Sequence, residues 1–219
     1  MIKGAIFDVD GTLLDSMCIW LDAGERYLRK CGLEPEEGLG EKIFTMTLEE
    51  GAAYVKKGYH LSQSEDEIVS GVLEIVREFY YEEAPLKEGA KAFLQALQEH
   101  DIPMVVATSG NQELVEAAFT RLGILDYFDR IFTCTEVGVG KRYPDIYRCA
   151  AQYMETRPEE TYVFEDVLHA VRSAGSAGFR TVGIYDASSD KEQEEIRKSA
   201  DIYLGDLTDF SKFWEYAEK

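Results

Sequence analysis

The segment Phe7-Asp8-Val9-Asp10-Gly11-Thr12-Leu13-Leu14-Asp15-Ser16 follows a short apolar run, which predicts a buried strand over residues 4–8. Asp8 and Asp10 are two residues apart, and side chains at that spacing lie on the same face of a strand. If the chain curls after Asp8, one carboxylate can attack an electrophile while the other handles a proton. Gly11 and Thr12 favour a tight turn that brings backbone N–H groups close to an anion.

The composition limits the class of protein. The chain has 219 residues, of which 45% are hydrophobic, and this suits one α/β domain with an insert. It carries 42 acidic and 23 basic residues, a net charge of −19. This acidity argues against a nucleic-acid or anionic-membrane partner, since either would need a basic face. An anionic substrate would need local positive charge, which a divalent metal and one or two lysines can supply.

The cysteines and the hydropathy indicate the compartment. The four cysteines are scattered without CxxC spacing or a nearby histidine, so neither structural zinc nor a disulfide framework is expected. Four reduced thiols fit a reducing cytoplasm. The sequence has no recognisable signal peptide and no apolar stretch of membrane-spanning length. We therefore expect a cytoplasmic protein, with the oligomeric state open and a monomer as the working assumption.

A helical segment follows the first strand. Apolar residues at helical spacing predict three helices between residues 15 and 83. Thr47 and Ser64 are predicted N-caps, because each is followed three residues later by a glutamate. The three helices cover residues 16–31, 47–59 and 64–82.

From residue 88 onward, predicted helices and strands alternate. Short apolar strands that alternate with helices indicate a parallel sheet covered on both faces. The sequence therefore predicts an α/β fold with a Rossmann-like, doubly wound core over residues 1–14 and 84–219, and a small helical cap domain over residues 15–83. The predicted strands cover residues 103–107, 130–133, 161–164, 180–184 and 201–204, and the predicted helices cover residues 88–99, 111–122, 144–154, 168–177 and 207–218.

Four polar clusters lie where predicted strands end. Ligands of such sheets bind beyond the carboxyl ends of the strands, so we expect the clusters to converge. A carboxylate nucleophile, a second carboxylate as acid and base, a hydroxyl and a lysine together fit phosphoryl transfer through a carboxylate. Carboxylate and carbonyl oxygens also suit Mg²⁺, the cofactor we expect. The clusters are Asp8 with Asp10, Thr108-Ser109-Gly110, Lys141, and Glu165-Asp166.

Together and in this order, these motifs resemble the haloacid dehalogenase superfamily, in the branch with a helical cap after the first motif. The resemblance implies that Asp8 is the nucleophile and a metal ligand. Asp10 would be the general acid and base, with its backbone carbonyl on the metal. Asp166 would be a metal ligand, with Glu165 a ligand through water, and Lys141 would steady the nucleophile and the phosphate.

The resemblance also implies further contacts with the substrate. Gly11, Thr12, Thr108 and Ser109 would bind the phosphoryl group together with Lys141. Ser16 and Trp20 are candidates for contact with the organic part of the substrate.

The chain departs from the family pattern in two places. Relatives often have a serine directly after the motif-four acids, where this chain has Val167, and this puts the outer hydrogen bonding around the metal in doubt. Relatives commonly have proline directly after the motif-three lysine, but here Arg142 and Tyr143 come before Pro144.

The predicted activity is Mg²⁺-dependent hydrolysis of a small phosphomonoester. A sugar phosphomutase of the beta-phosphoglucomutase type is the alternative. Two features disfavour it, because Trp20 stands near the position of a histidine found in such relatives and no arginine occurs between Arg29 and Arg77. A catalytically silent binding protein on the same fold is a further alternative, which the intact acids and lysine oppose. The leaving group, and any role of Arg142 or His169 in binding it, stay open.

Overall fold

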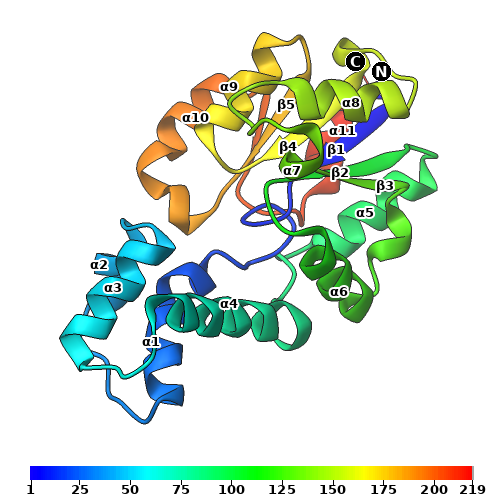
Figure 1. Ribbon diagram of the computed structural model, residues 1–219. Helices are drawn as coiled ribbons and strands as arrows, with labels where there is room; N and C mark the ends of the chain where they lie inside the picture. Colours follow the sequence, from blue (N-terminus) through cyan, green and yellow to red (C-terminus); the bar gives the residue numbers. More distant parts are fainter. Residues whose placement is uncertain (219) are drawn as a thin grey trace. The chain divides into compact units, whose positions relative to one another are not determined.

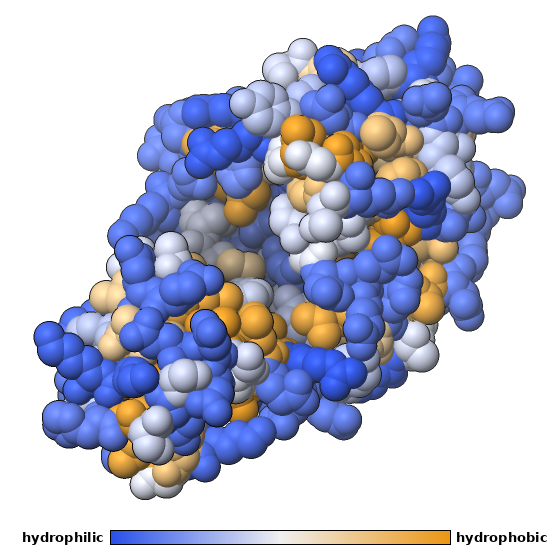
Figure 2. Space-filling model, in the orientation of Figure 1, coloured by the Kyte–Doolittle hydropathy of each residue, from blue (hydrophilic) through white to orange (hydrophobic). Residues whose placement is uncertain are grey.

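The computed structural model describes residues 1–218, which form two compact units. One unit combines Met1–Asp15 with the chain from Pro85 onward, and the other is Ser16–Ala84. Within residues 1–218, none of the helices combines the length and the apolar character needed to cross a bilayer. Hydrophilic residues cover most of the face shown in Figure 2, as the large acidic excess requires.

A six-stranded parallel sheet forms the first unit (Figure 1), in the order β3-β2-β1-β4-β5-β6. Ile6 of β1 pairs with Val105 of β2 on one side and with Val163 of β4 on the other. The predicted doubly wound α/β fold is therefore confirmed. The strands are β1 Gly4–Phe7, β2 Met104–Thr108, β3 Arg130–Thr133, β4 Thr161–Glu165, β5 Arg180–Ile184 and β6 Ile202–Leu204.

Alternation along the strands builds a core on each face of the sheet. Ile6 belongs to a buried cluster with Tyr147 of α8 (Asp145–Tyr153). The next residue, Phe7, stacks on Phe164, whose ring also contacts Phe93 of α5 (Ala90–Glu99) and Phe213 of α11 (Phe210–Ala217). Helices thus cover both faces, which leaves the carboxyl ends of the strands as the place for a site.

The remaining helices of the first unit connect the strands. Two of them were not predicted from the sequence, α7 (Cys134–Val137) and α10 (Gln193–Ser199). The α7 helix has four residues, too few for a periodic pattern. These connecting helices are α6 Gln112–Leu122, α7 Cys134–Val137, α9 Leu168–Ser176 and α10 Gln193–Ser199, with 3₁₀ turns at Leu125–Tyr127, Pro158–Glu160 and Ala187–Glu192.

The second unit is helical throughout. Thr47 and Ser64 cap α3 (Leu48–Tyr59) and α4 (Glu65–Glu82) as predicted, and each hydroxyl accepts from the backbone N–H three residues on, at 3.2 Å. The sequence missed α2, which has only six residues and begins after Gly38 in a left-handed conformation without a side-chain cap. The helices are α1 Cys18–Lys30, α2 Leu39–Phe44, α3 Leu48–Tyr59 and α4 Glu65–Glu82.

Candidate active site

The sheet order places the first acidic residue at its centre. The chain passes from β1 to β2 on one side, and β4 pairs on the other side of β1. The Asp8 N–H donates to the Phe164 carbonyl at 3.0 Å and so extends the β1–β4 pairing past the end of the strand. Asp8 therefore lies beside the end of β4, where Glu165 is the last residue of the strand and Asp166 follows it. This reversal point is where open α/β sheets bind their ligands.

The turn after Asp8 packs its backbone against Asp166. Gly11 has φ +87°, and a Cβ built on it would lie 2.3 Å from Asp166 Oδ2, so the turn has no room for a side chain. Thr12 is fully buried, and its hydroxyl donates to Asp166 Oδ1 at 3.3 Å. Both residues were predicted to bind phosphate, and the contacts they make here position an acid of the site.

A buried lysine joins two of the acids. Lys141 Nζ donates to Asp8 Oδ1 and, at 2.7 Å, to Glu165 Oε1. The Tyr147 hydroxyl donates to the same Glu165 oxygen at 2.7 Å. Lys141 is 4% exposed, Asp8 7% and Asp166 1%, so three carboxylates and one ammonium share a site that is nearly closed to water.

Burial shifts the proton equilibria of this cluster. Burial raises the pKa of Glu165 to about 7, against the opposing charge of Lys141. Burial, followed by the charges of Asp8 and Glu165, raises the pKa of Asp166 well above its usual range. For Lys141, burial lowers the pKa, but the charges of Asp8 and Glu165 together raise it above its ordinary value. The cluster thus has more negative charge than one lysine neutralises.

The acids fit a hard divalent cation. Asp8, Glu165 and Asp166 each offer a carboxylate oxygen within 4.8 Å of the others. Asp166 Oδ2 and Glu165 Oε2 are buried without a hydrogen-bond partner among residues 1–218. Buried acceptors without donors are costly, and a cation with oxygen ligands would satisfy them. Mg²⁺ prefers such ligands together with water.

The predicted phosphate-binding groups Thr108 and Ser109 lie at the end of β2, as its last residue and the one after it. Thr108 is fully buried, and its hydroxyl accepts from the Gly110 N–H at 2.8 Å. A Cβ built on Gly110 would lie 3.1 Å from Thr108 Oγ1 and 3.3 Å from Asp10 Oδ2, so these oxygens flank the same glycine. Ser109 Oγ is exposed and lies 3.4 Å from Cys134 Sγ.

A family model described as haloacid dehalogenase-like hydrolase matches residues 5–184, most of the chain. The chain belongs to this family. Its curated relatives include Validoxylamine A 7'-phosphate phosphatase of Streptomyces hygroscopicus subsp. limoneus, 30% identical over 95% of this hydrolase and 96% of that protein. Hexitol phosphatase A of Escherichia coli K12 is 30% identical over 83% of this chain and 82% of its own. This hydrolase is thus an enzyme of the phosphatase type within the family.

A solved structure shares the fold of this hydrolase. A Thermotoga maritima protein provisionally assigned as a beta-phosphoglucomutase superposes with a TM-score of 0.86 at 24% identity, over 98% of this chain and 99% of that one. At that identity the likeness supports the fold alone. The expected membership of the haloacid dehalogenase superfamily is confirmed by the family match.

The predicted substrate-contacting residues belong to the helical unit. Ser16 is fully buried, and its carbonyl accepts from the Ile19 N–H at 3.2 Å at the start of α1. Trp20 is 37% exposed. In the core unit, Arg142 and His169 line one surface depression, where burial and then the charge of Arg142 lower the pKa of His169.

Sequence reasoning missed the residues that support the acids. Tyr147 lies in an otherwise apolar buried stripe of α8, and a buried tyrosine hydroxyl usually has a partner, so its position was a usable signal. Ser189 Oγ donates to the Asp166 carbonyl at 2.8 Å and is itself bound by Gln193 Nε2 at 2.7 Å. The Tyr203 hydroxyl donates to Gln193 Oε1 at 2.7 Å and ties this chain of bonds to β6. Ser189 thus puts a hydroxyl against the backbone carbonyl of Asp166, the residue before Val167.

Proposed function

We propose that the protein is a Mg²⁺-dependent phosphomonoester hydrolase that forms an aspartyl-phosphate on Asp8. One observation carries the proposal: Asp8, Lys141, Glu165 and Asp166 form a single buried cluster at the reversal point of the sheet. The phosphatase names of the relatives support the same reaction class.

The first step transfers the phosphoryl group to the enzyme. A carboxylate oxygen of Asp8 forms a bond to phosphorus while the bond to the leaving alcohol oxygen breaks. Asp10 gives its proton to that oxygen. Lys141, fixed by its bonds to Asp8 and Glu165, keeps the nucleophile in place and offsets negative charge. Asp8, Asp166 and Glu165, with the Asp10 carbonyl, would hold Mg²⁺, which neutralises charge on the phosphoryl oxygens when bound.

The second step releases phosphate. Asp10, now ionised, takes a proton from water as the water oxygen bonds to phosphorus and the bond to Asp8 breaks. The Thr108 hydroxyl and the N–H groups that follow it suit the phosphoryl oxygens, because Thr108 lies at the same strand-end edge as Asp8. The products are the alcohol, phosphate and the original Asp8 carboxylate.

The substrate class is a small phosphorylated metabolite. The buried groups of the core unit suit only the phosphoryl group and the cation, so we assign selection of the organic part of the substrate to residues 16–84.

The four cysteines are free in residues 1–218, which supports a reducing, cytoplasmic location.

Phosphate release from a panel of phosphomonoesters tests the proposal. Wild type with Mg²⁺ is expected to release phosphate, and EDTA or Asp8→Asn to abolish release. Asp10→Asn should lower kcat by about 10²–10⁴-fold, the usual worth of a general acid and base. A protein that retains full activity as Asp8→Asn would refute the aspartyl-phosphate route.

The mutase alternative has its own readout in the same experiment. Conversion of a hexose 1-phosphate to its 6-phosphate, without net phosphate release from any ester, would replace the hydrolase with a phosphomutase. If neither reaction occurs although calorimetry shows that the protein binds Mg²⁺, the result would favour the silent binding protein.

A further inference from the structure

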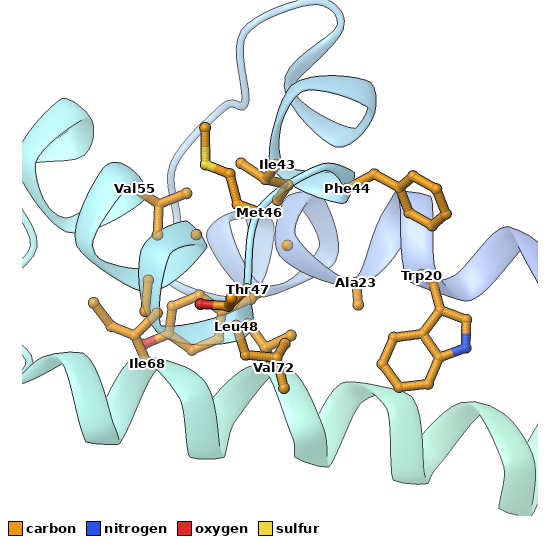
Figure 3. Close-up of a pocket in the computed structure, with 14 residues that line it drawn as sticks. Trp20, Ala23, Ile43, Phe44, Met46, Thr47, Leu48, Val55, Ile68 and Val72 are labelled. Atoms are coloured by element: carbon orange, nitrogen blue, oxygen red, sulfur yellow. The ribbon is translucent and has the colours of Figure 1, made fainter. Parts of the chain in front are cut away.

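An apolar cavity in the helical unit and an ion pair in the core unit are two buried features outside the four motifs. Side chains such as Ile43, Met46 and Val72 surround the cavity, which measures about 200 Å³ (Figure 3). Among residues 1–218, its lining contains no charged side chain, so it has no charge with which to hold or offset a buried acid. The ion pair, between Lys87 and Asp186, leads through hydrogen bonds to the acids of the candidate active site.

The ion pair of Lys87 with Asp186 is largely buried. The Lys87 ammonium donates to Asp186 Oδ2 at 2.5 Å and to the Tyr185 carbonyl at 3.1 Å. The Lys87 side chain is 16% exposed and that of Asp186 is 3% exposed. Removal of one partner of a buried pair leaves the other charge uncompensated, which is costly. The pair therefore fixes the chain just beyond the end of β5, where Asp186 lies.

Asp186 in turn holds the residue that supports Asp166. Asp186 Oδ1 accepts from the Ser188 N–H at 2.8 Å and so caps the 3₁₀ turn at Ala187–Glu192. The Asp186 carbonyl accepts from the Ser189 N–H at 3.2 Å. Ser189 Oγ then donates to the Asp166 carbonyl at 2.8 Å. A displacement of Asp186 would thus displace the donor that holds the backbone of Asp166.

The backbone of Lys87 reaches the turn that holds the Asp166 side chain. The Lys87 N–H donates to the Leu13 carbonyl at 2.8 Å. Leu13 belongs to the turn after Asp8, and its neighbour Thr12 donates to Asp166 Oδ1 at 3.3 Å. Lys87 therefore contacts two chain segments that hold Asp166, one that binds its carboxylate and one that binds its carbonyl.

We propose that Lys87 is a positioning residue of the metal site, which keeps Asp166 aligned because it joins the turn after Asp8 to the loop after β5. The inference rests on the proposed Mg²⁺-dependent function. The Lys87 ammonium acts through Asp186 and Ser189, and its backbone N–H acts through the turn. Removal of groups that lie behind metal ligands typically weakens metal binding by about 10- to 100-fold.

Charge and position change Mg²⁺ affinity in opposite directions when Lys87 is replaced. The charge of Asp186 acts on Asp166, whose pKa is raised by burial first, then by the two other acids of the site and then by Asp186. Loss of the Lys87 ammonium would leave the Asp186 charge unbalanced and make the site more negative. Charge alone therefore predicts tighter binding of Mg²⁺. A misplaced Asp166 predicts weaker binding, so the direction of the change in Kd separates the two roles.

Calorimetric titration with Mg²⁺ tests the assignment. Lys87→Met removes the charge from a side chain of similar length, and we expect its Kd for Mg²⁺ to rise about tenfold or more. Lys87→Arg keeps a charged donor for Asp186 and should recover most of the lost affinity. The Mg²⁺ concentration that gives half-maximal phosphate release should rise in Lys87→Met by the same factor as Kd.

The matched control is Lys3→Met. Lys3 also pairs with an acid of the core unit, Glu160, at 3.1 Å. It precedes β1 and so lies at the other end of that strand from Asp8. Loss of this pair should leave the Kd for Mg²⁺ at its wild-type value.

A double variant keeps the test open if Lys87→Met does not fold, as judged by circular dichroism. Lys87→Met combined with Asp186→Asn removes the ion pair without leaving a buried charge, and asparagine can still cap the turn. The summed charge of the pair is unchanged, so charge alone predicts wild-type Mg²⁺ affinity for this variant. Loss of position predicts weaker binding, and wild-type affinity would overturn the assignment.

The outcomes separate this assignment from the proposed function. If wild type binds Mg²⁺ and Lys87→Met binds it as tightly or more tightly, the positioning role is refuted and the phosphatase proposal is unaffected. The role is also refuted if Lys3→Met weakens binding as much as Lys87→Met does, or if Lys87→Arg recovers no affinity. If wild type binds no Mg²⁺, the metal dependence of the proposed function fails, and the role of Lys87 fails with it. If Lys87→Met weakens Mg²⁺ binding as expected but wild type hydrolyses no ester, the positioning role stands and the proposed hydrolysis fails.

Discussion

The turn after Asp8 packs closely against the acidic cluster, and at Gly11 this packing leaves no room for a side chain. We expect Gly11→Ala to weaken Mg²⁺ binding at least 100-fold by calorimetry, because its Cβ would displace the Asp166 carboxylate. Gly178→Ala is the matched control: its φ is +89°, close to the +87° of Gly11, but its Cβ would meet only Pro158, at 3.7 Å. Both variants should lose about 1–3 kcal/mol of stability from backbone strain. Equal Mg²⁺ affinities in the two variants would contradict this account.

The Asp166 carboxylate should lower the stability of the metal-free protein, although Mg²⁺ binding needs it. Asp166 is buried beside two further acids, and its Oδ2 has no hydrogen-bond partner within residues 1–218. Asp166→Asn removes a buried charge, so in EDTA we expect it to unfold in urea with about 1–3 kcal/mol more stability than wild type. The same variant should lose the Mg²⁺-dependent rise in melting temperature. A variant less stable than wild type in EDTA would show that the acids do not repel one another in the metal-free state.

At the scale of elements, the segment from β5 to α10 supports the end of β4. Ser189 donates to the Asp166 carbonyl, and Gln193 holds Ser189. We expect Ser189→Ala to weaken Mg²⁺ binding about 10-fold or more, in the range found when groups behind metal ligands are removed. The exposed Ser199, at the end of α10, is the control, and Ser199→Ala should bind Mg²⁺ as wild type does. An unchanged Mg²⁺ affinity in Ser189→Ala would reduce this chain of bonds to a purely structural role.

The elements also show how far the sequence could be interpreted. All six strands and the long helices follow from apolar runs and helical spacing, because burial imposes those patterns locally. The capping boxes at Thr47 and Ser64 are equally local. The contacts of Ser189 with Asp166 and of Tyr147 with Glu165 join residues 23 and 18 positions apart. Such contacts depend on how β4, α8 and the 3₁₀ turn at Ala187–Glu192 pack, which no local pattern encodes.

For the molecule as a whole, the buried acids couple stability to pH in the absence of metal. Burial raises the pKa of Glu165 from 4.5 to about 7, so the folded protein binds more protons than the unfolded chain between those pH values. Stability therefore falls as pH rises through this window. In EDTA, we expect urea denaturation to give about 2–3 kcal/mol less stability at pH 8 than at pH 5 from this group. Asp166 acts in the same direction.

Two variations separate this acid effect from the general acidity of the chain. Glu165→Gln removes one of the titrating groups and should reduce the pH dependence in EDTA, whereas Glu159→Gln changes the net charge equally at an exposed site and should not. Mg²⁺ binds only the folded state, so tenfold excess over its Kd should add about 1.4 kcal/mol and raise the melting temperature by roughly 3–6 °C. At one fixed Mg²⁺ concentration the gain should be larger at pH 8 than at pH 5, because protons compete with the cation for the same oxygens and raise its Kd at the lower pH. A pH dependence that persists unchanged in Glu165→Gln would show that Glu165 is not its source and would assign it to the other acids of the chain.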